Sequence, residues 1–313
     1  MDVEEYLSRH EGKIREEISE ILSDVRPLEL KRACLHLTKG GKLLRPLLVL
    51  ASCEAVGGEP SEALEAAAAV EIVHLFTLIH DDIMDESEER RGVKTVHTVW
   101  GVPIAITAGD FLLARAFEML GPDPRVSTIL ASSIREVCEG QAMDVLMSQR
   151  LPSVTEAEYL KMVEKKTGSL MSAAAQIGAV IGGGKPGEVK TLSEYGRLLG
   201  ISFQIRDDVL SLGIASRVGK STDSDIRLGK PSLPILKAVK AGGIFSKIGR
   251  RDLTDREIEE IKKRMERAGI LEECNRKARS FAERAKRLLS GLRENPGRSF
   301  LLSLAEYAVA REK

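Results

Sequence analysis

The sequence predicts an all-α protein, and three observations support this class. Apolar residues recur with helical spacing along most of the chain, for example over residues 3–23 and 255–268. No segment longer than a few residues alternates polar and apolar side chains with the β-branched enrichment of strands. No linker interrupts the 313 residues, since the longest glycine run, Gly182–Gly184, is too short for one. We therefore expect a single domain over 1–313, built as one large helical bundle.

The individual helices are predicted from apolar periodicity, caps and breakers. Ser61 and Thr155 are expected N-caps, and Gly121-Pro122 is a helix breaker. The expected helices cover residues 3–23, 44–56, 61–85, 103–120, 126–147, 156–166, 169–181, 189–212, 234–240, 255–268, 271–292 and 299–310. Most are apolar on more than one side, so we expect them to be buried in the bundle.

The composition argues against several classes of protein. Lys+Arg and Asp+Glu both number 47, so no global charge indicates nucleic acid or an anionic membrane as a partner. Four scattered cysteines without a CxxC spacing are typical of reduced thiols in a cytoplasmic protein. The N-terminus lacks the pattern of a signal peptide. Glu71 interrupts the longest alanine-rich stretch, so we expect no transmembrane span.

One stretch, His74–Asp85, carries the strongest chemical signal, because an apolar helical run there ends in three aspartates. Asp81 and Asp85 fall on one face of a helix, with Asp82 beside them. Three neighbouring carboxylates repel one another unless a cation lies between them. Oxygen ligands suit Mg²⁺, which is usually completed by substrate phosphates. The alternative is a solvated helix end.

A second apolar run, residues 203–210, also contains paired aspartates, Asp207 and Asp208. Negative charge at a helix C-terminus opposes the helix dipole, which disfavours the solvated alternative. Two such helices facing each other across a bundle would hold divalent ions on both walls of a cavity. Those ions would bind a diphosphate and stabilise it as a leaving group.

Basic residues lie near both aspartate clusters in the sequence. Lys42 and Arg45 are spaced i, i+3 across a predicted helix start, where anions bind well. The others are Arg90, Arg91, Lys165, Lys166, Lys220 and Lys230. Each alone is more often a surface residue, so their joint placement is what indicates an anionic substrate.

Six motifs occur in order along residues 40–234. They are Gly40–Pro46 (GGKxxRP), His80–Gly92 (HDDxxDxxxxRRG), Ala108–Leu113 (AGDxLL), Lys166-Thr167 (KT), Phe203–Asp208 (FQxxDD) and Gly219–Lys230 (GKxxxSDxxxGK). This set resembles the motifs of the trans-isoprenyl diphosphate synthases, or polyprenyl synthetases.

Two positions depart from the family pattern. Ser211 replaces the last aspartate of the second motif, and Leu43 replaces an arginine of the first. We interpret Ser211 as one ligand fewer for a third ion.

The resemblance implies an isoprenoid-synthase-type bundle around a central cavity. It implies a Mg²⁺-dependent prenyltransferase that condenses isopentenyl diphosphate with dimethylallyl, geranyl or farnesyl diphosphate. The products would be geranylgeranyl diphosphate, farnesyl diphosphate or both, and the enzyme would be most similar to archaeal-type short-chain synthases. Two or three Mg²⁺ ions and a cytoplasmic homodimer are also implied, and residues 103–120 offer a plausible subunit contact.

The resemblance also assigns roles to individual residues. The metal ligands would be Asp81, Asp82, Asp85 and Asp207, with Asp208 completing the second aspartate motif. The allylic diphosphate would contact Arg90, Lys166, Lys220 and Lys230. Isopentenyl diphosphate would contact Lys42, Arg45, His74 and Arg91. Thr167 and Gln204 would stabilise the allylic cation through their oxygen dipoles.

Phe76 is the candidate determinant of chain length. It lies five residues before Asp81, roughly 7.5 Å down a helix at 1.5 Å per residue. An aromatic ring at this position, followed by the small Thr77, resembles the pattern of archaeal-type enzymes that make C20 products. Some of these enzymes also release C15 products. The alternative is that Phe76 is only a core residue.

Two other classes of protein remain as alternatives, and a third, the di-iron carboxylate bundle, is disfavoured. A longer-chain polyprenyl diphosphate synthase would share every motif. A class I terpene cyclase would share the first aspartate motif, but it would not need a second diphosphate site such as Lys42, Arg45 and Arg91 indicate. A di-iron carboxylate bundle would need paired Glu-x-x-His motifs on its helices, and the sequence has no such pair of motifs.

Overall fold

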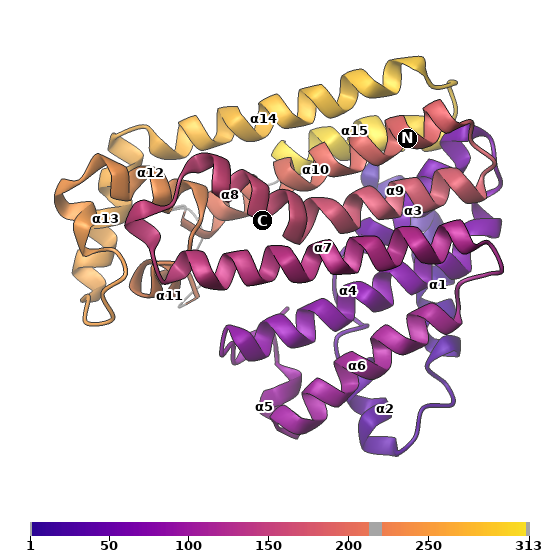
Figure 1. The fold of residues 1–313 in the computed structure, drawn as a ribbon, viewed down its shortest axis with the longest axis horizontal. Helices are drawn as coiled ribbons and strands as arrows, with labels where there is room; N and C mark the ends of the chain where they lie inside the picture. Colours follow the sequence, from indigo (N-terminus) through magenta and orange to yellow (C-terminus); the bar gives the residue numbers. More distant parts are fainter. Residues whose placement is uncertain (1, 213–220, 311–313) are drawn as a thin grey trace. The chain divides into compact units, whose positions relative to one another are not determined.

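The computed structural model describes residues 2–212 and 221–310, which are helical almost throughout (Figure 1). The all-α class predicted from the sequence is therefore confirmed. The chain forms two compact units. Unit 1 comprises Met1–Ala131, Ala173–Leu192 and Leu292–Leu301, and unit 2 comprises Ser132–Ser172, Ser193–Gly291 and Leu302–Lys313. The single domain over 1–313 stays a prediction.

Unit 1 has helix α4 at its centre. Its elements are α1 (Val3–Ile21), α2 (Leu28–Leu35), α3 (Leu44–Val56), a 3-10 helix (Pro60–Ala63), α4 (Leu64–Met84), β1 (Glu89–Arg90), β2 (Val93–Lys94), α5 (Val96–Trp100), α6 (Val102–Glu118) and parts of α7 (Pro124–Ser148), α9 (Ser169–Ile181), α10 (Pro186–Leu212) and α15 (Pro296–Ala310). Helix α4 contacts α1, α3 and α6, and in Figure 1 it runs beside α6. Its residues 66–73 are all buried, which explains why no polar face is visible there in the sequence.

Unit 2 contains the remaining parts of those four helices and the elements that lie between and after them in the sequence. The latter are a 3-10 helix (Leu151–Ser153), α8 (Glu156–Val163), a π-helical turn (Glu164–Gly168), α11 (Ser221–Leu228), α12 (Leu233–Ala241), a 3-10 helix (Gly243–Lys247), α13 (Asp255–Arg267), α14 (Ile270–Leu288) and a 3-10 helix (Leu289–Gly291). Thr155 forms a capping box with Glu158 at the start of α8, as its sequence position predicts. Thr254 and Glu257 cap α13 in the same way.

Some boundaries and short elements differ from the sequence prediction. Ser61 is not an N-cap, because Pro60 begins a 3-10 helix there and α4 starts only at Leu64. The helix expected over 156–166 leaves α-geometry after Val163. The prediction missed α2, α5, α11 and the hairpin β1–β2, all of which are too short to show a clear period.

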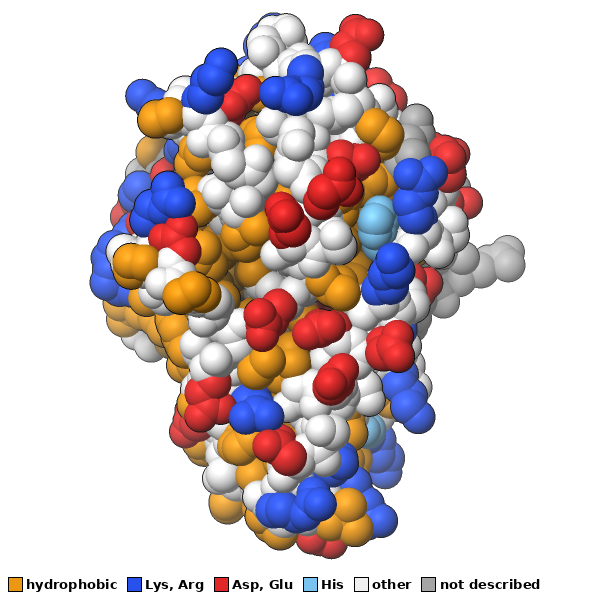
Figure 2. All heavy atoms as spheres, turned by 90° about the vertical axis from the view of Figure 1, so that its right-hand side faces the viewer, with side chains coloured by type: hydrophobic (Ala, Val, Ile, Leu, Met, Phe, Trp, Pro, Cys, Tyr) orange, Lys and Arg blue, Asp and Glu red, His pale blue; other side chains and the backbone are white. Residues whose placement is uncertain are grey.

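The described residues contain one helical segment, Pro60–Met84, with the length and hydropathy to cross a membrane. Within its most apolar window, 67% of the residues are buried in the protein. Core helices of soluble proteins have the same composition, so this segment is weak evidence for a membrane span. Figure 2 shows acidic and basic side chains interspersed on one face of the molecule, as the balanced composition predicts.

Replacement of Gly178 by alanine should destabilise unit 1. A Cβ atom at Gly178, in α9, would lie 2.0 Å from the carbonyl oxygen of Val49 in α3, and a backbone atom cannot move aside. We expect the free energy of unfolding, measured with urea, to fall by about 1–3 kcal/mol. Gly12 in α1 has no atom within 4 Å of such a Cβ, so Gly12→Ala should instead add about 0.5–1 kcal/mol. Equal effects would contradict the close approach of α3 and α9.

Candidate active site

The first aspartate motif lies at the C-terminal end of α4. Asp85 caps this helix, and its N–H donates to the carbonyl oxygen of Asp81 at 2.8 Å. The Asp82 side chain is 1% exposed, and its Oδ1 accepts a hydrogen bond from Arg90 Nε at 2.6 Å. Its Oδ2 is buried and has no hydrogen-bond partner among the described residues. Burial raises the pKa of Asp82, and the neighbouring Arg90 opposes that rise.

This motif fits a magnesium site that is completed by substrate. A buried carboxylate oxygen without a partner is costly, and a cation would satisfy it. Asp81 and Asp85, which are half-buried, lie one helical turn apart. Within the described chain, no three His, Cys, Asp or Glu residues form a closed metal-binding group. An open set of carboxylates suits Mg²⁺, which keeps several waters and takes phosphate oxygens as further ligands.

The hairpin β1–β2 positions the two arginines that follow the aspartates. Arg90 pairs with Val93, which leaves Arg91 and Gly92 as the two-residue turn. Their φ angles are 53° and 77°, and two positive values are the requirement of a type I′ turn. Glycine adopts this conformation freely, whereas Arg91 adopts it at a cost in energy, as residues at functional sites often do. The turn directs Arg90 to Asp82 and Arg91 to the loop before α3.

The glycines of the first motif accommodate the side chain of Arg91. Arg91 Nη1 donates to the carbonyl oxygens of Leu37 at 3.0 Å and Gly40 at 2.8 Å. Gly41 has a φ of +89°, and a Cβ atom there would lie 2.6 Å from the guanidinium carbon of Arg91. The motif therefore needs glycine both for its backbone conformation and for the space that the guanidinium fills.

Helix α3 begins beside this arginine. Leu43, which replaces the family's arginine, is buried, is its N-cap and has a φ of 49°. Lys42 precedes it at the surface, and Arg45 lies in the first turn of the helix. A helix N-terminus with flanking cations favours anions, so this end of unit 1 suits a diphosphate.

The spacing of Glu71 and His74 on α4 matches a single Glu-x-x-His motif, and the charges of Arg45 and Arg91 act on both residues. Burial raises the pKa of Glu71 to about 6, although Arg45 and Arg91 oppose that rise. Burial together with the same two arginines lowers the pKa of His74 well below its ordinary value. His74 is therefore neutral at pH 7 and acts as a hydrogen-bonding group rather than as a cation.

Phe76 lies one turn before His80 and packs against it. Its side chain is 8% exposed, and the two ring centroids are 4.8 Å apart in a T-shaped arrangement. Gly109 of the third motif makes room for the His80 ring, since a Cβ atom there would lie 2.2 Å from Nε2. Thr77, four residues before Asp81, shares the helical face of that aspartate. Phe76 lies roughly 140° around the helix from Asp81.

In unit 2, the π-helical turn carries Lys166 and Thr167. Lys166 Nζ donates to Asp144 Oδ2 at 2.6 Å, and Thr167 Oγ1 donates to Gln204 Oε1 at 2.9 Å. Gly140 of α7 permits this placement, because a Cβ atom there would lie 2.3 Å from the backbone nitrogen of Lys166. The sequence alone predicts Lys166 and Thr167 as site residues, but it does not indicate that α7 holds them in place.

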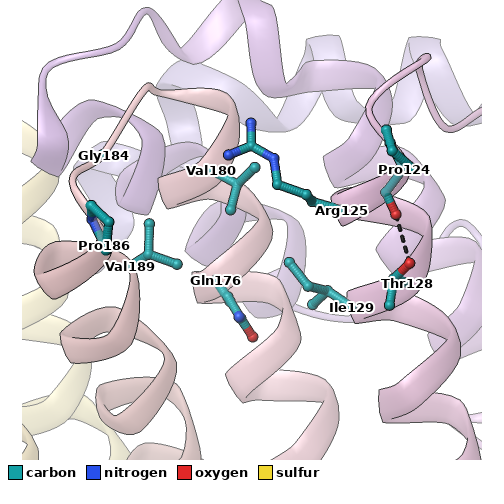
Figure 3. A pocket seen from close by; sticks show the side chains of 9 residues that line it. All are labelled: Pro124, Arg125, Thr128, Ile129, Gln176, Val180, Gly184, Pro186 and Val189. Atoms are coloured by element: carbon teal, nitrogen blue, oxygen red, sulfur yellow. Dashed lines mark hydrogen bonds between the residues drawn. The ribbon is translucent and has the colours of Figure 1, made fainter.

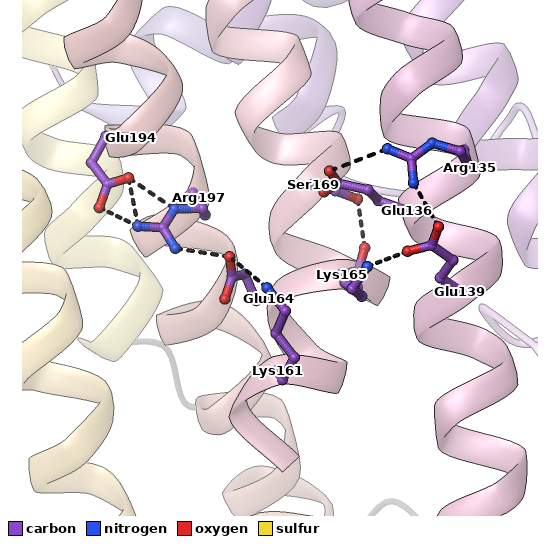
Figure 4. A network of polar contacts seen from close by, with 9 residues as sticks. All are labelled: Arg135, Glu136, Glu139, Lys161, Glu164, Lys165, Ser169, Glu194 and Arg197. Carbon is purple, nitrogen blue, oxygen red and sulfur yellow. Dashed lines mark hydrogen bonds and ion pairs between the residues drawn. The ribbon is translucent and has the colours of Figure 1, made fainter. Parts of the chain in front are cut away.

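A network of ion pairs surrounds this turn (Figure 4). Lys165 pairs with Glu139 of α7, so the two adjacent lysines of the turn both reach the same helix. On the other side, Arg197 of α10 bridges Glu194 and Glu164, at 2.5 and 2.9 Å. The turn is thereby attached to a helix on each side, which fixes the backbone from which Lys166 and Thr167 project.

The two aspartates of the second motif differ in their surroundings. Asp207 is exposed. Asp208 is 9% exposed, and burial raises its pKa to about 7. Its Oδ1 accepts from Gln204 Nε2 at 2.9 Å, and its Oδ2 accepts from Tyr159 Oη at 2.6 Å and from the backbone N–H of Leu233 at 3.1 Å. Asp207 is therefore better suited than Asp208 to bind a metal ion.

Lys230, another predicted residue of unit 2, lies just before the start of α12. Lys230 Nζ lies 3.6 Å from Asp225 Oδ1, and its N–H donates to the Asp225 carbonyl. Ser211, at the position where the family has an aspartate, donates to the carbonyl oxygen of Asp208 at 3.0 Å. Lys220 lies outside the described residues.

The sequence prediction missed three residues that support the site: Asp144, Tyr159 and Gly140. Gly140 had a detectable signal, because a glycine within a long helix often marks a close backbone approach. Asp144 and Tyr159 had none, since their partners are distant in sequence and only the fold brings them together.

Each unit also has a pocket that contains none of the predicted site residues. The pocket of unit 1 has a volume of about 570 Å³. It is lined by Pro124, Arg125, Thr128, Ile129, Gln176, Val180, Gly184, Pro186 and Val189 (Figure 3). The pocket of unit 2, of about 460 Å³, lies beside Met143, Met147 and Glu158. Neither is the site that the motifs define.

Comparison with known proteins gives a consistent result over nearly the whole chain. The family model for polyprenyl synthetase matches residues 27–265. A protein of Geoglobus acetivorans named geranylgeranyl pyrophosphate synthase is 43% identical over 96% of this chain and 96% of its own length. A geranylgeranyl diphosphate synthase of Methanosarcina mazei is 42% identical over 94% of both chains. The crystal structure of geranylgeranyl pyrophosphate synthetase from Pyrococcus horikoshii matches with a TM-score of 0.91, at 37% identity and 99% coverage of both chains.

Proposed function

Because this chain belongs to the polyprenyl synthetase family, we propose that it is a short-chain prenyltransferase. It condenses isopentenyl diphosphate with allylic diphosphates to geranylgeranyl diphosphate, farnesyl diphosphate or both. The full-length similarity to geranylgeranyl diphosphate synthases supports this proposal. The observation that carries it is the state of Asp82, a buried carboxylate held by Arg90 with one oxygen left for a cation.

The proposed reaction begins when the bond between C1 and oxygen of the allylic diphosphate breaks, and its electron pair leaves with diphosphate. Mg²⁺ supplies positive charge that stabilises this leaving group when bound. Asp81, Asp82, Asp85 and Asp207 are its proposed ligands. Arg90, Lys166, Lys220 and Lys230 add direct charge stabilisation of the diphosphate. Thr167 and Gln204 direct oxygen atoms towards the allylic cation.

Isopentenyl diphosphate is the proposed second substrate. Lys42, Arg45 and Arg91 are the proposed cationic contacts of its diphosphate, and neutral His74 donates a hydrogen bond. The double bond of isopentenyl diphosphate attacks C1 of the allylic cation, and a new carbon–carbon bond forms. A proton then leaves the resulting cation and passes to the released diphosphate. The apolar residues of α4 before Asp81 exclude water, which would quench the cation.

We further propose that the enzyme is a cytoplasmic homodimer that uses α5 and α6 as its contact. Val99, Val102 and Ile106 are 46%, 43% and 44% exposed on these two helices, and such apolar exposure is typical of subunit interfaces.

Sedimentation velocity at micromolar concentration should give twice the mass of the 34.3 kDa chain. A single species of monomer mass would contradict the dimer.

Asp81→Ala should abolish Mg²⁺-dependent turnover and leave the fold intact. Wild-type enzyme, incubated with isopentenyl and allylic diphosphates, should form product with Mg²⁺ and none after chelation. We expect kcat of the variant to fall by about 100-fold or more, since a group that stabilises the leaving charge is lost. Asp24→Ala is the control, because Asp24 is an exposed aspartate paired with Arg115. Retained turnover in Asp81→Ala, with unchanged circular dichroism, would reject the metal assignment.

Phe76→Ala should lengthen the product. The proposal makes Phe76 the floor of the pocket for the growing chain, so removal of its ring opens space for further isoprene units. Chromatography of radiolabelled products should show a shift beyond the wild-type length. Phe245→Ala is the matched control, because Phe245 is similarly buried, at 6% exposed, in unit 2. Products of unchanged length in Phe76→Ala would leave this residue with a core role only.

A further inference from the structure

A chain of hydrogen bonds in unit 2 connects Tyr159 to Thr167 through the side chains of Asp208 and Gln204. It begins at Tyr159 on α8, which is 0% exposed and donates to Asp208 Oδ2 at 2.6 Å. Asp208 Oδ1 accepts from Gln204 Nε2, and Gln204 Oε1 accepts from Thr167, both at 2.9 Å. Four side chains from α8, α10 and the π-helical turn thus form one connected path.

Every partner of the Asp208 carboxylate is placed as a donor. The N–H of Leu233, the first residue of α12, donates to Oδ2 at 3.1 Å, so the carboxylate also caps that helix. Together with Tyr159 and Gln204, this makes three hydrogen bonds to two oxygens. These bonds tie Asp208 to α8, α10 and α12.

The same arrangement determines which way the Gln204 amide faces. The hydrogen bonds from Tyr159 and the Leu233 N–H oppose the effect of burial on the pKa of Asp208 and favour its ionised form. An ionised carboxylate only accepts hydrogen bonds, so the NH₂ end of Gln204 turns to Asp208 and the carbonyl end turns to Thr167. The reversed amide would place NH₂ beside Thr167 and two acceptors against each other at Asp208. An amide oxygen has two lone pairs, and Thr167 uses one of them.

We infer that Asp208 and Tyr159 are positioning residues, which fix the carbonyl end of Gln204 towards the allylic cation. This inference rests on the proposed function, in which Gln204 directs an oxygen towards that cation. With the amide reversed, the positive end of its dipole would face a developing positive charge and oppose ionisation. Asp208 therefore acts through Gln204 and not as a ligand of Mg²⁺.

A reciprocal exchange of the pair tests this inference. In Asp208→Asn, the carbonyl oxygen stays with Tyr159 and Leu233, so the new NH₂ faces Gln204 and forces its amide to reverse. We expect kcat to fall by about 100-fold, with the KM for both diphosphates and the half-saturating Mg²⁺ concentration nearly unchanged. Adding Gln204→Glu supplies an acceptor for that new NH₂ and keeps an oxygen beside Thr167. We expect kcat of the double variant to be at least about tenfold higher than kcat of Asp208→Asn alone.

Tyr159→Phe provides a second test that does not alter charge. This substitution removes one hydrogen-bond donor from Asp208. We expect kcat to fall by about tenfold, because the free energy of one hydrogen bond to a charged group corresponds to a factor of about that size. Tyr6→Phe is the matched control, because Tyr6 is also 0% exposed and donates to a carboxylate, Glu54, at 3.1 Å in unit 1. Both variants should lose stability to urea, but only Tyr159→Phe should lose kcat.

Two results would overturn the inference. One is a double variant no more active than Asp208→Asn. The other is an Asp208→Asn enzyme whose kcat returns at high Mg²⁺, which would make Asp208 a metal ligand. If Asp208→Asn fails to fold, the comparison of Tyr159→Phe with Tyr6→Phe decides, and equal kcat values would overturn the inference. A wild-type enzyme that forms no prenyl product would instead reject the proposed function, so the two failures are distinguishable.

Discussion

The cost of burying a carboxylate determines how both aspartate motifs are built. Adjacent residues on a helix point about 100° apart, so on a helix that packs on several sides one of two consecutive aspartates can face into the protein. In each motif the second aspartate, Asp82 or Asp208, is buried, whereas the first is at least partly accessible. The protein supplies partners to the buried member: Arg90 for Asp82, and Tyr159, Gln204 and Leu233 for Asp208. The difference is that Asp82 keeps one unpartnered oxygen among the described residues, and Asp208 does not.

Close packing against the backbone is the second constraint, and it explains two glycines of the motifs, Gly41 and Gly109, and Gly140 of α7. Gly41 leaves room for the Arg91 guanidinium, Gly109 for the His80 ring and Gly140 for the backbone of Lys166. In each case a Cβ atom would come within 2.6 Å of the neighbouring group, closer than packed atoms allow. These glycines are far from one another in sequence, and two of them, Gly41 and Gly140, set the position of a residue with a proposed role.

The sequence was sufficient to predict the helical class and most long helices, because apolar periodicity over 10 or more residues is a strong local signal. It was also sufficient to identify the residues of the motifs. It could not show the hairpin at Arg90, which is too short to have a period, or the start of α4, where Pro60 outweighs Ser61. The partners Asp144 and Tyr159 depend on contacts across 22 and 49 residues, and no local pattern encodes them.

The π-helical turn Glu164–Gly168 has a consequence for how this chain can vary in length. A π-turn accommodates one residue more than the α-helical turn that it replaces, so it is equivalent to a one-residue insertion in a helix that otherwise continues from α8 into α9. Deletion of one residue here would restore a regular α-helix and rotate the following side chains by about 100°. A change that makes the helix more ideal would therefore separate Lys165 and Lys166 from α7. Sequence alignments and redesigns of this protein should treat the segment as fixed in length.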